Sequence, residues 1–453
     1  MKILLISSNV AETPYAVYPL GMSMVAAALE QDGHEIVLFD FLQRGQSFDA
    51  VRDEVRRVKP ELIGISIRNI DNVNLLHEQR YIDAVRSIVQ AIRGETGVKI
   101  VLGGSGFSVM PEPVLETVGA DYGIAGEGEK LFREFVAEAA HGRYPQDRIL
   151  YASPSLVGTE IPTAHYDADM MAFYLESGHM ASVQTKRGCE HGCVYCTYPL
   201  LEGHVIRERE PAVVVDDMET LVTRHGAKYI FFTDSVFNDS HGRYRAVVQE
   251  MKNRNLRVPW TAFFKPSAEL DHGIIELMRE TGLQAAELGS DAPTDTTLRG
   301  IGKDFLFRDV DRCNSMFIEH GVATAHYFMF GCPGETPETV VEGIANIKGL
   351  QKTAIFVFMG IRILPDTGLA SIALRDGLIR EGQSLLEPVY YISPKVDRQW
   401  MENTLKEAFA RIRHIVFPPD AMDAKLVFLF KLGFTGSLWD LLAKPKSSKA
   451  HAN

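Results

Sequence analysis

The chain has 453 residues, with 47 basic and 59 acidic side chains and a formal net charge of −12. Such an acidic chain is a poor partner for phosphate backbones, so the composition argues against nucleic-acid binding. No uncharged apolar run approaches the roughly 18 residues of a membrane span, and no signal-peptide pattern opens the chain. We therefore expect a cytoplasmic protein without a transmembrane segment. At about 150 residues per domain, roughly three domains are expected.

Residues 1–145 alternate short apolar runs with helical patterns. A helix is predicted at 20–31, and strands are predicted at 2–7, 35–40, 62–66, 99–102 and 122–125. Near-continuous apolar strands separated by helices are typical of a parallel sheet that is covered on both faces. We predict a doubly wound α/β domain that binds its ligand beyond the carboxyl ends of the strands.

The loops at that edge are rich in glycine and polar residues. They contain Ser66, Arg68, Asn69, Gly103, Gly104 and Gly126. Glycine allows a ligand to approach the backbone closely. No G-x-G-x-x-G motif opens the first helix, so a nicotinamide or flavin dinucleotide site is disfavoured.

Residues 146–180 read as a linker, and a second alternating series follows at 181–370. Six strands are predicted there, at 181–185, 229–233, 260–264, 285–289, 323–330 and 354–360. Successive strand–helix units indicate a partial (β/α)6 barrel of the TIM type, with catalytic groups where the strands end.

The strand–helix rhythm is lost in residues 371–453, which we interpret as a helical cap and tail. Residues 397–416 are predicted to form a helix, and 424–443 are apolar but interrupted by lysine and glycine. Two interpretations stay open for this apolar segment. It is either a cap packed on the barrel, or a contact with a hydrophobic substrate or a membrane surface.

The strongest chemical signal is a cysteine cluster at the end of the first barrel strand. Cys189, Cys193 and Cys196 form a C-x3-C-x2-C motif. Thiolates select zinc or iron–sulfur clusters. A structural zinc site needs four ligands, and although His191 could be the fourth, no second ligand pair exists. Three thiolates on one loop favour a 4Fe–4S cluster with one open iron. Zinc, or no metal at all, remains the alternative.

With Tyr195 as its aromatic residue, this loop resembles the signature of the radical SAM superfamily. Four further segments resemble that barrel in order: 230–235, 287–291 with Lys303, 330–336, and Arg362 with 364–367. The N-terminal domain resembles the cobalamin-binding domain of cobalamin-dependent radical SAM enzymes, in segments 18–21, 33–37, 103–104 with 111–112, and 126–129. The family's D-x-H-x-x-G cobalt-ligand motif is absent, and Asp291 stands where the family has glutamate.

The resemblance implies three cofactors: a 4Fe–4S cluster on the three cysteines, S-adenosylmethionine and cobalamin. The S-adenosylmethionine contacts that it implies are Tyr195, Thr233, Asp234, Ser290, Asp291 and Arg362. The cobalamin contacts that it implies are Tyr18, Leu20, Ser66, Arg68, Asn69, Gly103, Gly104, Gly126 and Glu127. Cys332, in the turn after the fifth strand, is a candidate hydrogen donor to a substrate radical, with a packing role as the alternative.

The resemblance also implies a reaction. The cluster would reductively cleave S-adenosylmethionine, and the resulting radical would abstract hydrogen from the substrate. We expect cobalamin-dependent methylation of an sp3 carbon in a small or lipid-like molecule, with flavodoxin or ferredoxin as electron donor. One alternative is a radical cyclisation, rearrangement or dehydration without methyl transfer. An alternative of another class is a non-catalytic corrinoid carrier or sensor. Peripheral membrane contact is a further possibility for the apolar segment.

Overall fold

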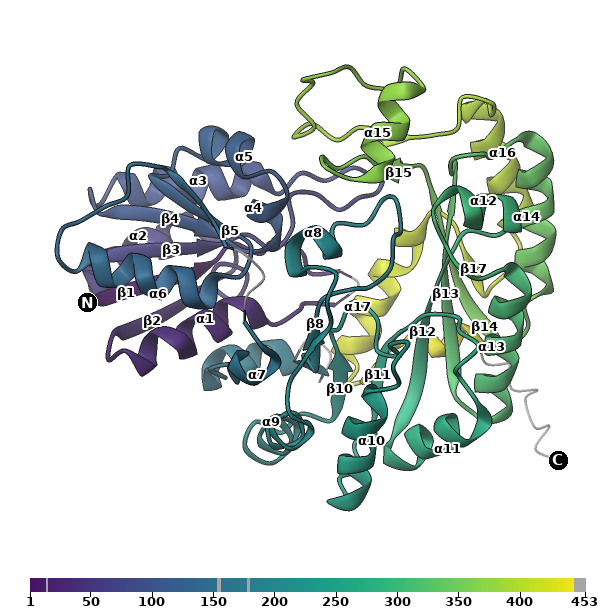
Figure 1. Ribbon diagram of the computed structural model, residues 1–453, viewed down its shortest axis with the longest axis horizontal. Helices are drawn as coiled ribbons and strands as arrows, with labels where there is room; N and C mark the ends of the chain where they lie inside the picture. Colours follow the sequence, from purple (N-terminus) through teal and green to yellow (C-terminus); the bar gives the residue numbers. More distant parts are fainter. Residues whose placement is uncertain (14, 153–155, 177–179, 444–453) are drawn as a thin grey trace.

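A computed structural model describes residues 1–13, 15–152, 156–176 and 180–443. Two parallel sheets lie side by side, the N-terminal one in purple and blue and the second in teal and green (Figure 1). Helices pack around both of them. Within the described part of the chain, no helix is long and apolar enough to cross a membrane. The predicted fold class is confirmed: a doubly wound domain, a parallel barrel-like sheet and a mostly helical C-terminal region.

The N-terminal sheet contains six parallel strands in the order β2-β1-β3-β4-β5-β6. They are β1 (Lys2–Ser7), β2 (Glu35–Asp40), β3 (Leu62–Ser66), β4 (Lys99–Gly103), β5 (Tyr122–Ala125) and β6 (Ile149–Tyr151). The register places Ser7 beside Ser66, and Ser66 beside Gly103. The carboxyl ends of these strands are therefore level, and the predicted ligand loops lie along one edge.

Helices cover both faces of this sheet. Helices α1 and α6 contact each other on one face, and α2, α3 and α5 contact one another in series on the other. The bounds are α1 (Leu20–Gln31), α2 (Phe48–Val58), α3 (Ile82–Arg93), α4 (Ser105–Val109), α5 (Pro111–Val118) and α6 (Gly128–Ala139). Coverage on both faces explains why these strands are continuously apolar instead of alternating.

The segment predicted as a linker is more ordered than expected. Residues Ile149–Tyr151 pair with β5 and extend the N-terminal sheet. A 3-10 turn η1 (Gly158–Glu160) and helix α7 (Ala168–Glu176) follow. The Tyr174 hydroxyl on α7 donates a hydrogen bond to Asp40 at 2.9 Å, which ties the helix to β2. Three strand residues are too few to show a periodic pattern, so the sequence did not reveal β6.

The second sheet has seven parallel strands in the order β17-β14-β13-β12-β11-β10-β7. They are β7 (Met180–Val183), β10 (Tyr229–Phe232), β11 (Trp260–Phe264), β12 (Leu283–Asp291), β13 (Ala323–Phe330), β14 (Thr353–Met359) and β17 (Ile415–Val416). The first six match the predicted strands. The seventh lies in the predicted helix 397–416, where α16 ends at Phe409. The β-branched pair before Phe417-Pro418 suits a strand, because proline cannot continue a helix.

Helices pack on the outer face of the second sheet, and two short antiparallel pairs flank it, β8 with β9 and β15 with β16. The pairs are β8 (Lys186–Arg187), β9 (Arg207–Glu208), β15 (Ile361–Arg362) and β16 (Tyr390–Tyr391). The helices up to the sixth strand are α8 (Tyr198–Glu202), α9 (Pro211–Arg224), α10 (Tyr244–Asn253), α11 (His272–Thr281), α12 (Asp295–Gly300), α13 (Phe307–Glu319) and α14 (Pro337–Gly349). The later ones are α15 (Gly368–Arg375), α16 (Arg398–Phe409), the 3-10 turn η2 (Pro419–Met422), α17 (Asp423–Lys431) and α18 (Asp440–Ala443).

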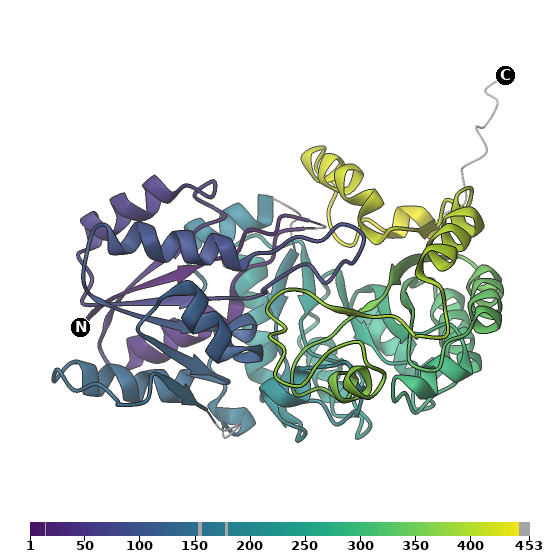
Figure 2. The same ribbon diagram turned by 90° about the horizontal axis from the view of Figure 1, so that it is seen from above.

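The apolar C-terminal segment packs on the second sheet (yellow in Figure 2). Trp439 and Leu442 cluster with residues of four strands, including Ala325 and Phe356. This packing agrees with the cap interpretation. Helix α17 buries Leu426 and Phe430 against Tyr15 and Leu438, whereas Phe428 on the helix and Leu432 and Phe434 just after it are exposed.

Candidate functional site

A cavity of about 570 Å³ lies between the carboxyl edge of the N-terminal sheet and the second sheet. All nine residues predicted to contact cobalamin line it: Tyr18, Leu20, Ser66, Arg68, Asn69, Gly103, Gly104, Gly126 and Glu127. The opposite wall includes Ser182, Gln184, Arg187, Thr197, Tyr198, Phe231, Thr233 and Phe263. One cavity therefore touches the loops of both sheets.

The shape of the cavity suits a large ligand that has a tail. Besides the loop residues, its lining includes Leu5, Gly64, Val101 and Phe132, which lie on the α1–α6 face of the sheet. The cavity thus has a section between the two sheets and an apolar extension along β3. The polar loop residues and the apolar residues of this lining could together hold a large cofactor such as cobalamin.

Gly104 shapes the loop at the centre of this wall. Its φ is +92°, a left-handed conformation that favours glycine, and a Cβ there would lie 2.6 Å from the Ile67 carbonyl oxygen. Gly103 differs, because a Cβ there would meet only the Ile124 oxygen at 3.8 Å. The backbone conformation therefore requires glycine at position 104, whereas Gly103 keeps the cavity wall free of a side chain.

The three cysteines lie on the loop between β8 and α8. Cys189 is buried, and Cys193 and Cys196 are partly buried. The pKa of the Cys196 thiol is raised to about 12, mainly by burial and in smaller part by Cys193 and Cys189. The thiols are thus near one another. Among the described residues, however, no group of three metal-ligating side chains lies close enough together to hold a metal ion without rearrangement. A bound iron cluster would favour the thiolate form of this soft donor set.

Two of the predicted S-adenosylmethionine contacts lie beside the cluster loop. The Tyr195 hydroxyl donates to Asp291 Oδ2 at 2.8 Å, and the Lys303 ammonium pairs with the same carboxylate. Asp291 and the Cys193 thiol both raise the pKa of Lys303, although burial opposes them. Lys303 therefore carries a positive charge next to the cysteines. The sequence motif that contains Lys303 predicted no role for this side chain.

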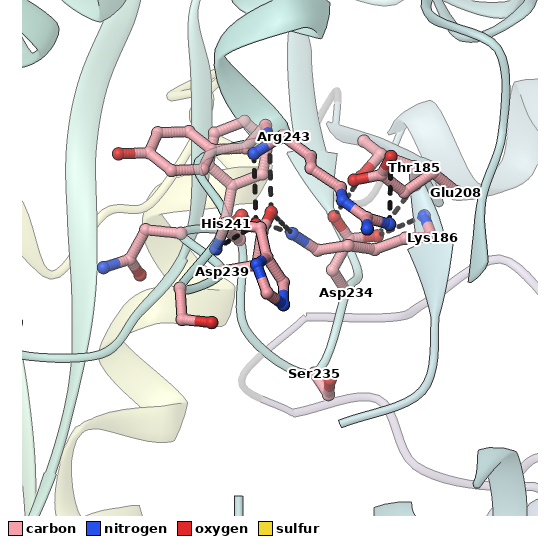
Figure 3. Close-up of polar contacts among 12 residues, drawn as sticks. Thr185, Lys186, Glu208, Asp234, Ser235, Asp239, His241 and Arg243 are labelled. Atoms are coloured by element: carbon pink, nitrogen blue, oxygen red, sulfur yellow. Dashed lines mark hydrogen bonds and ion pairs between the residues drawn. The ribbon is translucent and has the colours of Figure 1, made fainter. Parts of the chain in front are cut away.

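Asp234 supports the cluster loop instead of facing the cavity (Figure 3). Its carboxylate accepts hydrogen bonds from the Thr185 amide at 2.7 Å, the Thr185 hydroxyl at 2.5 Å and the Lys186 amide at 3.3 Å. The Lys186 ammonium in turn donates to Asp239 at 2.8 Å and to the Phe237 carbonyl at 2.6 Å. Of the two predicted ammonium partners, only Thr233 lines the cavity.

Ser290 lies on the face of the second sheet that its helices cover, and it is not among the residues that line the cavity. Its hydroxyl is 2.7 Å from His326 Nδ1, and His326 Nε2 is 3.1 Å from Asn314 Oδ1 on α13. All three side chains are buried between the sheet and its helices. Burial lowers the pKa of His326 to about 3, so this imidazole is neutral. Ser290 and His326 thus both face the helices and are joined by a buried hydrogen bond.

Arg362 forms its hydrogen bonds within the protein. Its Nε donates to Asp71 Oδ2 at 2.9 Å, and its terminal nitrogens donate to the Ile363 and Leu385 carbonyls. Asp71 belongs to the loop after β3, so this pair connects the N-terminal domain to the barrel. A guanidinium with these three partners is held by the interdomain contact, and its predicted contact with S-adenosylmethionine stays a prediction.

Cys332 is fully buried and does not belong to the cavity lining. Its thiol donates to the Met329 carbonyl at 3.3 Å, and burial raises its pKa well above the ordinary value. This placement favours the packing alternative over a hydrogen donor. The neighbouring Glu335 accepts hydrogen bonds from the Gly331 and Cys332 amides, and burial raises its pKa to about 7.

Aromatic side chains cover the inner face of the barrel sheet. Phe231 and Phe263 line the cavity, with their rings 5.5 Å apart and nearly perpendicular. Phe263 also contacts Tyr327, whose hydroxyl donates to Glu287 at 2.7 Å. Burial raises the pKa of Glu287 to about 7. Phe263 therefore lies on the cavity wall and not in the core of the sheet.

Four buried charges join the two loops that flank the cavity. Arg187, two residues before Cys189, pairs with Glu129 at 2.5 Å and with Glu127 at 3.4 Å. Arg207 donates to both oxygens of Glu127, at 2.6 and 2.8 Å. We refer to Arg187, Arg207, Glu127 and Glu129 as the charge bridge. The sequence predicted only Glu127 as a site residue, and the Lys186-Arg187 pair before the cysteines was an available signal for the rest.

Comparison with known proteins agrees with this geometry. A model of the B12 binding domain matches residues 6–136, and a model of the radical SAM superfamily matches residues 183–345. Tryptophan 2-C-methyltransferase of Streptomyces laurentii is 27% identical over 448 residues, covering 81% of this chain and 74% of that protein. An anaerobic magnesium-protoporphyrin IX monomethyl ester cyclase of Rubrivivax gelatinosus is 25% identical, covering 72% of this chain and 60% of that protein.

Solved structures show the same fold. The radical S-adenosylmethionine methyltransferase TsrM of Kitasatospora setae, with tryptophan and a SAM analogue bound, superposes with a TM-score of 0.86 at 24% identity. The match covers 98% of this chain and 97% of that one. The same enzyme with cobalamin and a [4Fe-4S] cluster gives a TM-score of 0.84.

The barrel and its cysteine loop define a radical SAM enzyme. With its B12 binding domain, the chain belongs to the cobalamin-dependent radical SAM enzymes. The predicted family, the enzyme class and the set of three cofactors are thereby confirmed. The individual contacts to S-adenosylmethionine and cobalamin stay predictions.

Proposed function

We propose that this enzyme transfers a methyl group from S-adenosylmethionine to a carbon atom of a small molecule bound between its two sheets. The observation that carries the proposal is the single cavity lined by both sets of loops. A substrate held there lies within reach of groups on both sheets. When bound, the cluster, S-adenosylmethionine and cobalamin supply the electron transfer and the methyl group, while the protein orients the reactants.

The residues of the cavity suit three tasks. Thr233, Tyr195 and Asp291 are our proposed contacts to S-adenosylmethionine, since they lie on the cavity wall or beside the cluster loop. Lys303 holds the Asp291 carboxylate in place. Gly103 and Gly104 present bare backbone to the cobalamin. Phe231 and Phe263 offer an apolar aromatic wall, which suits a flat ring or a hydrocarbon.

The names of related enzymes narrow the choice of substrate. They include a tryptophan 2-C-methyltransferase and a hopanoid C-2 methylase. Together with the aromatic wall, they support a ring-containing small molecule with a methyl-accepting carbon, and tryptophan is the first compound to test. We further propose that a flavodoxin or ferredoxin supplies electrons at the cluster loop, where Gly192 reaches the surface.

A second candidate is radical cyclisation without methyl transfer, because two relatives are anaerobic magnesium-protoporphyrin IX monomethyl ester cyclases. Anaerobic reconstitution with iron, sulfide and hydroxocobalamin distinguishes the two candidates. Methyl transfer predicts a retained corrinoid and S-adenosylhomocysteine formation that requires it. Formation of 5′-deoxyadenosine alone, without corrinoid retention, would favour the second candidate.

A further inference from the structure

We infer that Arg187 is a positioning residue that fixes the cysteine loop relative to the cobalamin loop through the charge bridge. The inference concerns the distance between two cofactors and does not depend on methyl transfer being the reaction. Arg187 lies two residues before Cys189, while Glu127 directly follows Gly126 at the carboxyl end of β5 and Glu129 lies in the first turn of α6. The charge bridge therefore joins a loop that carries cluster ligands to a loop that lines the corrin site.

The contacts of Arg187 leave its side chain little freedom. Besides its two carboxylates, Nε donates to Gln184 at 3.0 Å and Nη2 lies 3.1 Å from the Met24 sulfur on α1. The side chains of Arg187, Glu127 and Glu129 are each 6% exposed. Charge-assisted guanidinium–carboxylate bonds have strict geometry, so a shift of either loop would break them.

Gly188 connects Arg187 to Cys189, so the position of Arg187 determines where the cysteine loop begins. Gly188 has a φ of +93°, and a Cβ there would lie 2.2 Å from the Val205 carbonyl oxygen. Its amide donates to Glu202 at 3.0 Å, and the Cys189 amide donates to the Gly203 carbonyl at 3.1 Å. The backbone at Gly188 and Cys189 is therefore held against residues 202–205, which limits how far it can absorb a displacement of Arg187.

Lys186 and Arg187 connect the same short strand to two different domains. Successive strand residues point to opposite sides. Lys186 pairs with Asp239 within the barrel, at 4% and 2% side-chain exposure (Figure 3), while Arg187 reaches the N-terminal domain. The strand is thus anchored to the barrel by one cation and to the cobalamin loop by the next.

The energetics favour a positional role over one in overall stability. Desolvation of buried ions offsets much of their attraction, and well-packed apolar side chains would stabilise such an interface about as well. The second interdomain pair, Arg362 with Asp71, already connects the domains at another place. What the charge bridge adds is a directional contact beside the cluster ligands.

The test compares Arg187→Met with Arg209→Met in the full-length, reconstituted protein. Arg209 is a matched control, since it forms a buried pair with Asp217 at 2.7 Å inside the barrel, with side-chain exposures of 1% and 4%. Pulsed electron paramagnetic resonance of the reduced protein measures the interaction between cob(II)alamin and the reduced cluster. Iron and corrinoid contents are measured in parallel.

We expect Arg187→Met to keep both cofactors but to shift or broaden the cluster–cobalt distance distribution, whereas Arg209→Met leaves it as in the wild type. Glu129→Gln keeps a hydrogen-bonding group and should broaden the distance distribution to a smaller extent. If Arg187→Met does not fold, the Glu129→Gln variant tests the inference. An unchanged distribution in Glu129→Gln, or equal changes in Arg187→Met and Arg209→Met, would overturn the inference.

Discussion

Arg362 and Asp71 form a buried ion pair between the two domains, with Nε and Oδ2 2.9 Å apart and side-chain exposures of 3% and 2%. They are 291 positions apart in the sequence. Replacing Arg362 by Met should lower the free energy of unfolding by about 3–5 kcal/mol, because the Asp71 carboxylate would remain buried without its partner. Thermal unfolding of the variant measures this loss.

The double variant Arg362→Met, Asp71→Leu provides the control for that loss. Removing both charges should recover most of the stability, since no unpaired ion remains. A double variant as unstable as the single one would show that the pair has another role. Arg133→Met, at a surface pair with Asp32, should change the midpoint temperature little.

Gly103→Ala should weaken cobalamin binding without affecting folding. The added methyl group meets only the Ile124 oxygen at 3.8 Å, so the chain should fold normally. The methyl would project from the wall of the proposed corrin site, and we expect retained corrinoid to fall clearly below the wild-type level. Absorbance of the purified protein, normalised to its concentration, measures this.

Gly97→Ala is the matched control for that experiment. It adds a methyl group just before the same strand, where nothing lies within 4 Å. It should retain corrinoid like the wild type. If Gly103→Ala also binds corrinoid fully, the cofactor does not approach this part of the loop.

Cys193→Ala should abolish the iron chromophore after anaerobic reconstitution, because only two thiolate ligands would remain. Cys313→Ala is the control, since the Cys313 thiol is buried outside the loop and lies 3.6 Å from the Ser267 carbonyl. We expect it to retain iron and sulfide as the wild type does. An intact cluster in Cys193→Ala would contradict the ligand assignment.

Glu287 predicts a pH dependence of stability. Burial raises its folded-state pKa from 4.5 to about 7. As pH rises between these values, the unfolded carboxyl loses its proton while the folded one keeps it, so its contribution to stability falls, by at most roughly 3 kcal/mol. Above pH 7 the contribution stays constant.

Replacing Glu287 by Gln should remove this dependence. The variant should therefore gain midpoint temperature relative to the wild type between pH 5 and pH 8. Glu134→Gln, at an exposed position on α6, should show no such gain. Parallel curves for wild type and Glu287→Gln across this range would mean that the carboxyl ionises normally.

The sequence predicted the fold and the cofactor loops well because both depend on local patterns. Apolar runs locate parallel strands, and the carboxyl ends of such strands share an edge. Ser66, Gly103 and Gly126 therefore line one cavity, as predicted. The spacing of three cysteines on one loop is also local, so the sequence predicts a cluster site there without reference to other elements.

Roles that depend on distant partners or on strand orientation were less predictable. Alternate residues of β12 point to opposite faces of the sheet, and Ser290 is on the face covered by α13. A shift of the strand by one residue would turn Ser290 to the other face. Asp234 and Arg362 have the expected residue types at the expected positions, but Thr185 and Asp71 engage them. The strand β17 is only two residues long, which is too short for any periodicity.

The most direct test of the account follows the methyl carbon itself. The reconstituted enzyme is incubated anaerobically with S-adenosylmethionine labelled with ¹³C in its methyl group, a reductant and ring compounds that include tryptophan, with and without cobalamin. We predict a product with the labelled methyl bonded to carbon, seen by nuclear magnetic resonance, only when cobalamin is present. Label found only in methionine beside 5′-deoxyadenosine, with or without cobalamin, would contradict methyl transfer.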